Sequence, residues 1–312
     1  MAASDRLFRV GTRKSRLAQV QTEMALAAIS SARPGARFEV TGVTTVGDRN
    51  RTVAITTLGD GVFTNELEAA LLDGKIDLAV HSLKDLPTEL PDGLCLAAVL
   101  TREDPRDALV SREGETLADL PPGARIGTGS PRRGAQLLAR RPDLEVVLLR
   151  GNVDTRVRKV LEDGEADAAV LAVAGLKRLG MDQVITETFE PDVVMPAIGQ
   201  GFLAIEVRRD DEDVLALAGT AQDDNARRCA DAERAFLSAV GGGCKAPLAA
   251  YATVRQGTLT MIGMVANLSG GDLLTERVEG DLSPIEAGAL LKERLFARGA
   301  EGIIAAMESA SV

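Results

Sequence analysis

The chain has 312 residues, with 46 acidic and 36 basic side chains and a formal net charge of −10. This acidic balance argues against a nucleic-acid partner, and an aromatic content of 3% argues against a protein that stacks single-stranded bases. No apolar run approaches the ~20 residues of a membrane helix, and the N-terminal segment lacks the apolar core of a signal peptide. We therefore expect a cytoplasmic protein of two or three domains with an aliphatic core.

Three cysteines and one histidine restrict the metal and disulfide chemistry. Cys95, Cys229 and Cys244 match no metal-ligand spacing, and an odd number in a chain expected in the cytoplasm argues against a disulfide framework. Because His81 is the sole histidine of the sequence, we expect no zinc site. We interpret His81 as a hydrogen-bonded packing residue.

The N-terminal third alternates short apolar runs with amphipathic segments, which is typical of an α/β fold. The runs predict strands from Leu7 to Gly11, Phe38 to Thr45 and Ile76 to Val80, and helices from Ser15 to Ile29 and Thr64 to Leu72. Helical spacing predicts that the first helix turns one face to the core, with Leu17, Val20, Met24 and Ile29 on it. Between these elements, Gly59-Asp60-Gly61 is expected to form a loop.

A second alternating set follows. Strands are predicted from Ala124 to Gly127, Leu144 to Leu149 and Ala168 to Val173. Pro131 suits the first position of a helix, and Asp154 is expected to cap the helix that carries Arg156. Such alternation predicts parallel sheets with right-handed crossovers, whose ligands bind at the carboxyl ends of the strands.

The last third has a different pattern. A helix is predicted from Asn225 to Val240, followed by an antiparallel meander from Ala249 to Arg255, Thr258 to Asn267 and Leu273 to Glu279. Ser283-Pro284-Ile285-Glu286 is a capping box that opens a helix to about Arg298. These elements predict a small α+β domain.

Seven basic side chains follow predicted strands or open the next helix: Arg13, Arg132, Arg133, Arg150, Arg156, Lys177 and Arg178. Helix N-termini add free N–H groups and a partial positive charge at such places. Thr128 and Ser130 precede the paired arginines, so this turn resembles an anion cradle of hydroxyls, amides and guanidiniums. The pattern predicts a cleft for a ligand that carries several carboxylates or phosphates.

Two further residues are candidates for chemistry. Cys244 follows three glycines and precedes Lys245, which favours an accessible, reactive thiol; the alternative is a helix C-cap followed by a small packed residue. Asp85 lies just beyond a buried strand, where a carboxylate can protonate a leaving group or stabilise a cation. The alternative for Asp85 is a helix cap or a surface ion pair.

Five sequence blocks together resemble the porphobilinogen deaminase family, also called hydroxymethylbilane synthases. They are HSLKDLP at 81–87, GTGSPRR at 127–133, LRGNVDTR at 149–156, PAIGQG at 196–201 and GGC at 242–244. The blocks span nearly the whole chain. The resemblance implies two α/β lobes related to periplasmic binding proteins and a small α+β C-terminal domain that carries the cysteine. The implied boundaries are 1–100 with 200–219 for the first domain, 105–195 for the second and 222–312 for the third.

The resemblance also implies an activity in tetrapyrrole (haem) biosynthesis. Family members carry a dipyrromethane cofactor, here attached through a thioether to Cys244. They add four porphobilinogen molecules head to tail with loss of ammonia, and water then releases hydroxymethylbilane. The growing chain is a polyanion, because every pyrrole brings an acetate and a propionate. A monomer is expected from the family.

The resemblance assigns roles residue by residue. Asp85 would be the catalytic residue, holding pyrrole N–H groups and stabilising positive charge on the pyrrole. The cofactor would be bound by Cys244, Lys84, Asp85, Thr128, Ser130, Arg132, Arg133 and Arg156. The substrate and growing chain would be bound by Arg13, Ser15, Arg150, Arg156, Arg178, Gln200 and Gly201, with Gly199 beside them.

The chain departs from the family pattern at a few positions. Gly129 stands where many members have serine, Phe202 where a small residue is usual, and Arg16 where proline is frequent. Thr56 and Asp60 replace lysines of some members, which weakens the case for a cationic lid. The competing hypothesis is a non-catalytic binding protein or effector-sensing domain with the same two-lobed fold, which would need neither Asp85 nor Cys244.

Overall fold

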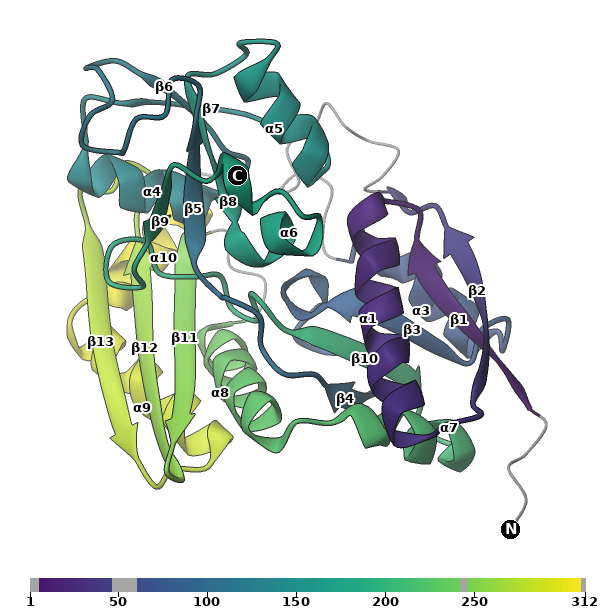
Figure 1. Cartoon of the computed structure of the whole chain (residues 1–312). Helices are drawn as coiled ribbons and strands as arrows, with labels where there is room; N and C mark the ends of the chain where they lie inside the picture. The colour runs from purple at the N-terminus through teal and green to yellow at the C-terminus, as the bar shows by residue number, and fades with distance from the viewer. Residues whose placement is uncertain (1–5, 47–60, 242–245, 310–312) are drawn as a thin grey trace. The chain divides into compact units, whose positions relative to one another are not determined.

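In the computed structural model, which describes residues 6–46, 61–241 and 246–309, the chain forms two compact units (Figure 1). The first unit comprises Met1–Glu103 and Gly201–Arg227, and the second comprises Asp104–Gln200 and Arg228–Val312. The predictions that concern Thr56, the Gly59-Asp60 part of the expected loop, and Cys244 with Lys245 lie outside the described residues.

The first unit is built on a five-stranded sheet of order β2-β1-β3-β10-β4. Its strands are β1 (Leu7–Arg13), β2 (Arg37–Val43), β3 (Leu78–Ser82), β4 (Leu94–Val99) and β10 (Leu203–Arg208). Its helices are α1 (Arg16–Ala32), α3 (Asn65–Leu72) and α7 (Glu212–Ala218). The strands and helices predicted for the N-terminal third are therefore confirmed, with shifts of a few residues at their ends.

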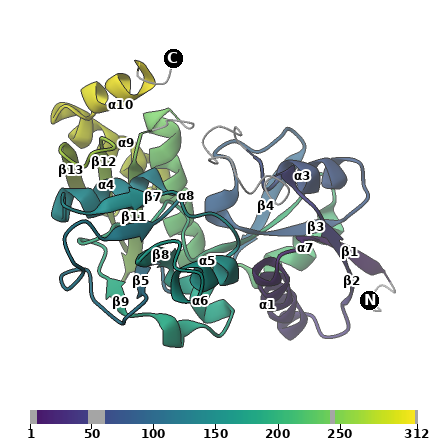
Figure 2. The ribbon, with the colours of Figure 1, turned by 90° about the horizontal axis from the view of Figure 1, so that it is seen from above.

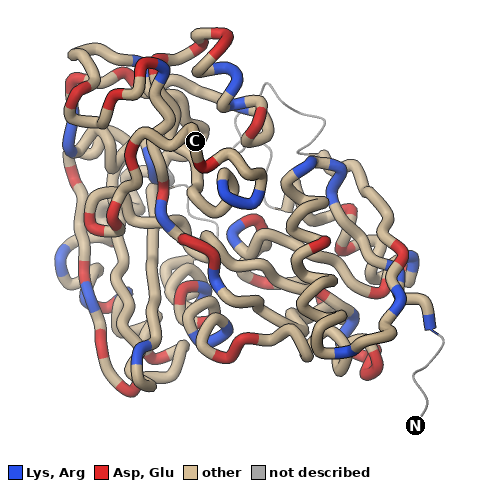
Figure 3. Tube along the Cα trace, in the orientation of Figure 1, with Lys and Arg blue, Asp and Glu red and all other residues tan. Residues whose placement is uncertain are grey.

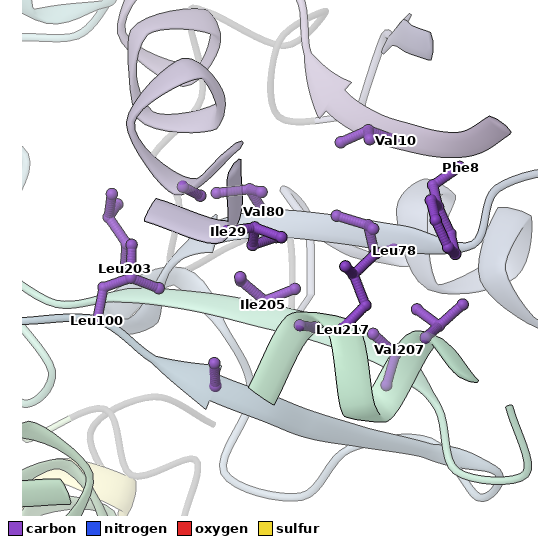
Figure 4. Packing of buried hydrophobic residues seen from close by; sticks show 14 residues of the cluster. Phe8, Val10, Ile29, Leu78, Val80, Leu100, Leu203, Ile205, Val207 and Leu217 are labelled. Atoms are coloured by element: carbon purple, nitrogen blue, oxygen red, sulfur yellow. The ribbon is translucent and has the colours of Figure 1, made fainter. Parts of the chain in front are cut away.

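Helices cover both faces of this sheet because its strands are apolar on both sides. On one face, side chains of β3 and β10 pack with Ile29 of α1 and Leu217 of α7 (Figure 4). On the other face, Leu67 and Leu71 of α3 pack on Ala79. The predicted buried face of α1 is wrong in part: Met24 is 41% exposed, and the helix instead buries the small residues Ala18 and Ala25 beside Ile29.

The second unit contains another five-stranded sheet, of order β7-β6-β8-β5-β9. Its strands are β5 (Asp107–Ser111), β6 (Arg125–Gly127), β7 (Glu145–Val147), β8 (Ala168–Ala172) and β9 (Glu187–Phe189). Its helices are α4 (Pro131–Arg140), α5 (Val153–Leu161) and α6 (Val173–Arg178). Leu137 of α4 packs on one face of the sheet, and Val157 of α5 with Leu176 of α6 packs on the other.

Each five-stranded sheet contains one reversed strand, so the prediction of parallel sheets is wrong for β5 and β10. β10 pairs antiparallel with β3 and β4, and β5 pairs antiparallel with β8 and β9. Both are the first strands after the chain has passed from one unit to the other. No crossover helix precedes them, so each begins at the edge where its neighbours end: Leu203 pairs with Ser82, and Asp107 pairs with Ala172.

The C-terminal part of the second unit is the predicted α+β arrangement. It consists of α8 (Asp224–Val240, which begins in the first unit), β11 (Leu248–Arg255), β12 (Thr258–Ala266), β13 (Leu273–Gly280), α9 (Pro284–Ala297) and α10 (Ala300–Ser309). The three strands form an antiparallel meander, and the capping box is present, with Ser283 and Glu286 each accepting from the other's backbone N–H. Figure 2 shows α9 and α4 on opposite faces of this sheet. Residues 104–200 and 228–312 thus share one unit, and the three domain boundaries stay predictions.

Gly270 lets the turn between β12 and β13 approach α4 closely. Its φ is +74°, and an added Cβ would collide with the carbonyl oxygen of Ala135 and the nitrogen of Ala139. We expect Gly270→Ala to lower the free energy of unfolding by about 3 kcal/mol, from backbone strain and overpacking together. Gly257→Ala is the matched control, since φ there is +80° but nothing lies within 4 Å of the added Cβ. At Gly257, strain alone should lower the free energy of unfolding by about 1 kcal/mol. If urea unfolding gave equal losses for the two variants, the close packing of Gly270 on α4 would be contradicted.

The mixed α/β class with a small α+β part at the C-terminus is confirmed by these three sheets. Within the described ranges, none of the helices combines the length and apolar character that crossing a membrane requires.

Candidate functional site

Asp85 lies in a short turn that leaves the end of β3. Residues Leu83–Asp85 form a single 3-10 turn after Ser82. Leu83 is 1% exposed, and its N–H donates to the carbonyl oxygen of Phe202 at 3.1 Å, which fastens the turn to the start of β10. The Asp85 side chain is 31% exposed, so a buried anchor presents a carboxylate that a ligand can reach.

Arg13 provides the positive charge beside Asp85. It ends β1, and its Nη1 lies 3.8 Å from Asp85 Oδ2. The Arg13 guanidinium carbon lies 4.1 Å from the ring centre of Phe63, a cation–π contact that orients the side chain. The ion pair that the sequence left open as the alternative for Asp85 is therefore present, and the catalytic role of Asp85 stays a prediction. Lys84 is exposed next to Asp85, and Ser15 caps α1, with its Oγ accepting from Ala18 N at 3.3 Å.

His81 is a buried residue of β3, the strand that precedes the Asp85 turn. It is 5% exposed, and its Nε2 lies 2.9 Å from Oε2 of the fully buried Glu206 on β10. Glu68 of α3 is buried as well and interacts electrostatically with His81 and Glu206. Burial raises the pKa of Glu68, a hydrogen bond with Thr64 lowers it, and the charge of Glu206 raises it further. The packing interpretation of His81 agrees with this burial.

Phe202, which stands where a small residue is usual in the family, packs under the Asp85 turn. Its ring is 1% exposed, and the Arg102 guanidinium carbon lies 4.1 Å from the ring centre. Since its carbonyl oxygen also holds Leu83, Phe202 is part of the support under the Asp85 turn.

In the second unit, Arg132 and Arg133 lie in the first turn of α4 and share one carboxylate. Arg132 Nη2 donates to Asp107 Oδ2 at 2.7 Å, and Arg133 donates to Asp107 Oδ1 through Nη2 at 2.6 Å and Nε at 3.1 Å. Burial raises the pKa of Asp107, but the charges of Arg132 and Arg133 outweigh it and hold that pKa well below its usual range. Burial lowers the pKa of Arg132.

Asp107 is absent from the residues predicted from the sequence. The signal was a charged residue at the head of the apolar run Ala108-Leu109-Val110, where a fully buried side chain must be paired. The reversed direction of β5 brings it to the carboxyl end of β8, against the arginines. Reading β5 as a strand that enters from the other unit would have found it.

Backbone carbonyls and Gln200 complete this network. Arg132 Nη1 donates to the carbonyl oxygen of Met195, and Arg133 Nη1 donates to that of Val170 at 3.0 Å. Gln200 is 1% exposed, and its Nε2 donates to Asp107 Oδ1 at 2.9 Å and to the Pro105 oxygen at 2.7 Å. Gln200, predicted as a substrate-binding residue, therefore contacts the arginine pair through Asp107.

In the turn before α4, both hydroxyls hold the local backbone, and the anion cradle stays a prediction. Thr128 Oγ1 accepts from Ser130 N at 3.1 Å, and Ser130 caps the helix by accepting from Arg133 N at 3.4 Å. A Cβ at Gly129 would meet no atom closer than 3.6 Å, so the space for the family's serine is retained.

Arg150 follows β7 and is 9% exposed. Burial lowers its pKa, and among the described residues its buried Nη1 has no hydrogen-bond partner. A desolvated cation of this kind is costly unless an anion joins it. Arg156 is half-buried on α5, and its Nε donates to the Gly151 oxygen at 2.8 Å.

Two expectations about helix ends are wrong. Asn152, rather than Asp154, is the N-cap of α5, and Asp154 lies in the first turn. Lys177 and Arg178 lie in the last turn of α6, not at its start. The helix begins directly at Val173, since β8 passes into α6 without a loop, so both residues come one turn later than expected.

The glycines at the return between the units are closely packed. Gly199 N donates to Oε2 of the buried Glu233 at 2.7 Å. Gly201 has a φ of +94°, and a side chain there would collide with the Glu103 carbonyl oxygen. Over the described residues, Lys and Arg alternate with Asp and Glu along both units (Figure 3), so the cationic character is local to the residues described above.

Comparison with known proteins agrees with these local features. The family model "Porphobilinogen deaminase, dipyromethane cofactor binding domain" matches residues 8–216, and "Porphobilinogen deaminase, C-terminal domain" matches residues 227–297. The porphobilinogen deaminase of Syntrophotalea carbinolica is 49% identical over 98% of this chain and 97% of its own length. That of Roseiflexus castenholzii is 48% identical over 95% of this chain and 98% of its own length.

Two solved structures have distant similarity to this chain. The Bordetella pertussis BvgS VFT2 domain has a TM-score of 0.42 at 17% identity, covering 69% of this chain and 86% of that chain. The methionine binding protein MetQ has a TM-score of 0.42 at 18% identity, covering 71% and 92%. The sequence matches, by contrast, extend over nearly the whole chain and favour the transferase over a non-catalytic binding protein. The chain belongs to the porphobilinogen deaminase family, the transferases of tetrapyrrole biosynthesis.

Proposed function

We propose that this chain builds hydroxymethylbilane from four porphobilinogen molecules on a dipyrromethane primer held by a thioether to Cys244, as a monomer in the cytoplasm. The family supports the reaction and the primer. The three cysteines, without a disulfide pattern, support the reducing compartment. Purified protein given porphobilinogen should release ammonia and hydroxymethylbilane, which mass spectrometry of the products can follow.

The observation that carries the proposal is a local excess of buried positive charge at three arginines of the second unit. Arg132 and Arg133 place two buried guanidiniums against one carboxylate, and Arg150 is a buried cation whose Nη1 lacks a partner among the described residues. These residues fit a dipyrromethane, because its acetate and propionate groups are carboxylates of the kind that guanidiniums bind in pairs. Thr128, Ser130, Lys84 and Arg156 are proposed to bind the same cofactor.

When bound, the dipyrromethane supplies the pyrrole carbon to which the first substrate unit is added. The residues of this chain hold and orient the anionic side chains of the incoming units. For substrate binding we propose Arg13, Ser15, Arg150, Arg156 and Arg178, with Gln200 and Gly201 shaping the return of the chain.

Asp85 is proposed as the catalytic residue. As ammonia leaves porphobilinogen, its nitrogen takes the electron pair of the breaking C–N bond, and positive charge spreads from that carbon onto the pyrrole nitrogen. A carboxylate fixed near that N–H stabilises the charge as it forms. The buried Leu83 anchor keeps Asp85 in place, so little reorganisation is needed when the charge appears.

Arg150→Leu and Arg156→Leu should stall elongation at discrete intermediates, because each removes a guanidinium that binds carboxylates of the growing chain. Their effects on stability should differ. Arg150→Leu removes a buried cation that has no carboxylate partner among the described residues, and it is expected to raise the free energy of unfolding by about 1 kcal/mol. Arg156→Leu removes a hydrogen bond to Gly151 and is expected to lower it by about 1 kcal/mol.

Intact mass spectrometry after brief exposure to porphobilinogen checks the first expectation, and urea unfolding checks the second. The matched control is Arg112→Leu, a basic residue outside the proposed machinery. Normal elongation in both variants would contradict the roles given to Arg150 and Arg156.

A further inference from the structure

The convergence of Arg132 and Arg133 needs an explanation, because they are adjacent on a helix. Successive side chains of an α-helix point about 100° apart. Both guanidiniums nevertheless reach the two oxygens of Asp107, the first residue of β5, at 2.7 and 2.6 Å. Asp107 is 0% exposed. The shared carboxylate is therefore what brings the two cations together.

Charge makes the same partner necessary. Both arginines are 6% exposed and lie in the first turn of α4, where the helix dipole adds positive charge. Two buried cations at this place need a buried anion. Within the part of the chain that the structure describes, Asp107 compensates one of them and leaves one positive charge in excess.

The geometry of Asp107 is itself fixed. Its Oδ1 accepts from Arg133 and from Gln200 Nε2, and Gln200 is anchored in turn on the Pro105 oxygen. Among the described residues, the Arg132 side chain donates through Nη1 to the Met195 carbonyl oxygen and through Nη2 to Asp107. A guanidinium has five N–H donors, so Arg132 keeps donors for a ligand.

We propose that Asp107 is a positioning residue for carboxylate binding by this enzyme. It holds Arg132 and Arg133 at the N-terminus of α4 in one orientation, with donors and a single positive charge left for one carboxylate of the pyrrole chain. This inference rests on the proposed function of the two arginines as carboxylate ligands. Asp107 does not touch the substrate; it acts through them.

Asp107→Asn tests the inference, with Asp104→Asn as matched control. Asn keeps the shape but places an N–H₂ group against the donors of one arginine, and it leaves both cations without the charge of Asp107. We expect a smaller fraction of the purified protein to carry the dipyrromethane by intact mass, and a rise of about tenfold or more in KM for porphobilinogen in the loaded fraction. Asp104, which pairs with Arg106 on the same segment, should change KM by less than about twofold when replaced.

A purely structural role would lower the melting temperature without moving KM, so both are measured. The coupling is tested with Arg132→Gln and the double variant Asp107→Asn/Arg132→Gln. If Asp107 acts through Arg132 and Arg133, the KM of the double variant should rise by less than the product of the two single effects, because Arg132 carries part of the effect of Asp107. A KM that rises by the product of the two single effects would overturn the inference.

Should Asp107→Asn not fold, Asp107→Glu carries the test. It keeps the charge but moves the carboxylate by one methylene. KM should therefore rise, by a smaller factor than the rise of about tenfold expected for Asp107→Asn. A wild type without porphobilinogen turnover would refute the proposed function. Normal wild-type turnover with unchanged KM in the Asp107 variants would refute this inference alone.

Discussion

Asp85→Asn is expected to lower the rate of porphobilinogen consumption by roughly 100-fold or more. The amide has the shape of the carboxylate but no negative charge, so it cannot stabilise the positive charge that forms as ammonia leaves. The turn that carries Asp85 is held by Leu83 and Phe202 rather than by the Asp85 side chain. The melting temperature should therefore change little. Ammonia release at saturating porphobilinogen, with thermal unfolding of the same sample, measures both quantities.

Asp92→Asn is the matched control in the same unit, since Asp92 is exposed and lies in the loop before β4. It should leave turnover within about twofold, as surface substitutions usually do. If Asp85→Asn turned over porphobilinogen as the wild type does, Asp85 would have no place in the mechanism. A collapse of turnover with a large loss of stability would instead assign Asp85 to the surface ion pair with Arg13.

Apolar periodicity predicted the strands and helices well, because both units bury apolar runs between covering helices. It failed to predict the direction of two strands and the buried face of one helix. The reversal of β5 and β10 comes from the passage of the chain between the units, which local pattern does not encode. The buried face of α1 was misjudged because Ala18 and Ala25, not the larger Met24, fit against the sheet.

The candidate residues divide in the same way. The contact of Arg13 with Asp85 follows from two strand ends meeting at one edge of a sheet, which the sequence can predict. The position of Asp107 at the head of an apolar run signals a buried charge, but its partners depend on the antiparallel register of β5 with β8, which local sequence does not encode. Arg150 was predicted from its position after a strand, but only the structure shows that its cation is buried.

Cys244→Ser is expected to abolish both the covalent cofactor and the activity. Wild-type protein from a host that makes porphobilinogen should be heavier than its sequence by two linked pyrroles, and the serine variant should have the sequence mass. The reason is the nucleophilicity of sulfur. A thiolate attacks the electron-poor pyrrole carbon and forms the thioether readily, whereas a serine hydroxyl, which has a much higher pKa, does not. Intact mass under denaturing conditions measures this directly, because only a covalent group survives.

The other two cysteines provide controls of the same chemistry. Cys229 is buried and therefore out of reach of a pyrrole, and burial raises the pKa of the Cys95 thiol, which disfavours its thiolate. Cys95→Ser and Cys229→Ser should therefore keep the added mass, and Cys95→Ser, at a half-buried position, should also keep the activity. An active wild type with the bare sequence mass would refute the tether. If the added mass were lost in Cys95→Ser and kept in Cys244→Ser, the cofactor would be attached to Cys95 in the first unit. The role assigned to Cys244 would then be wrong.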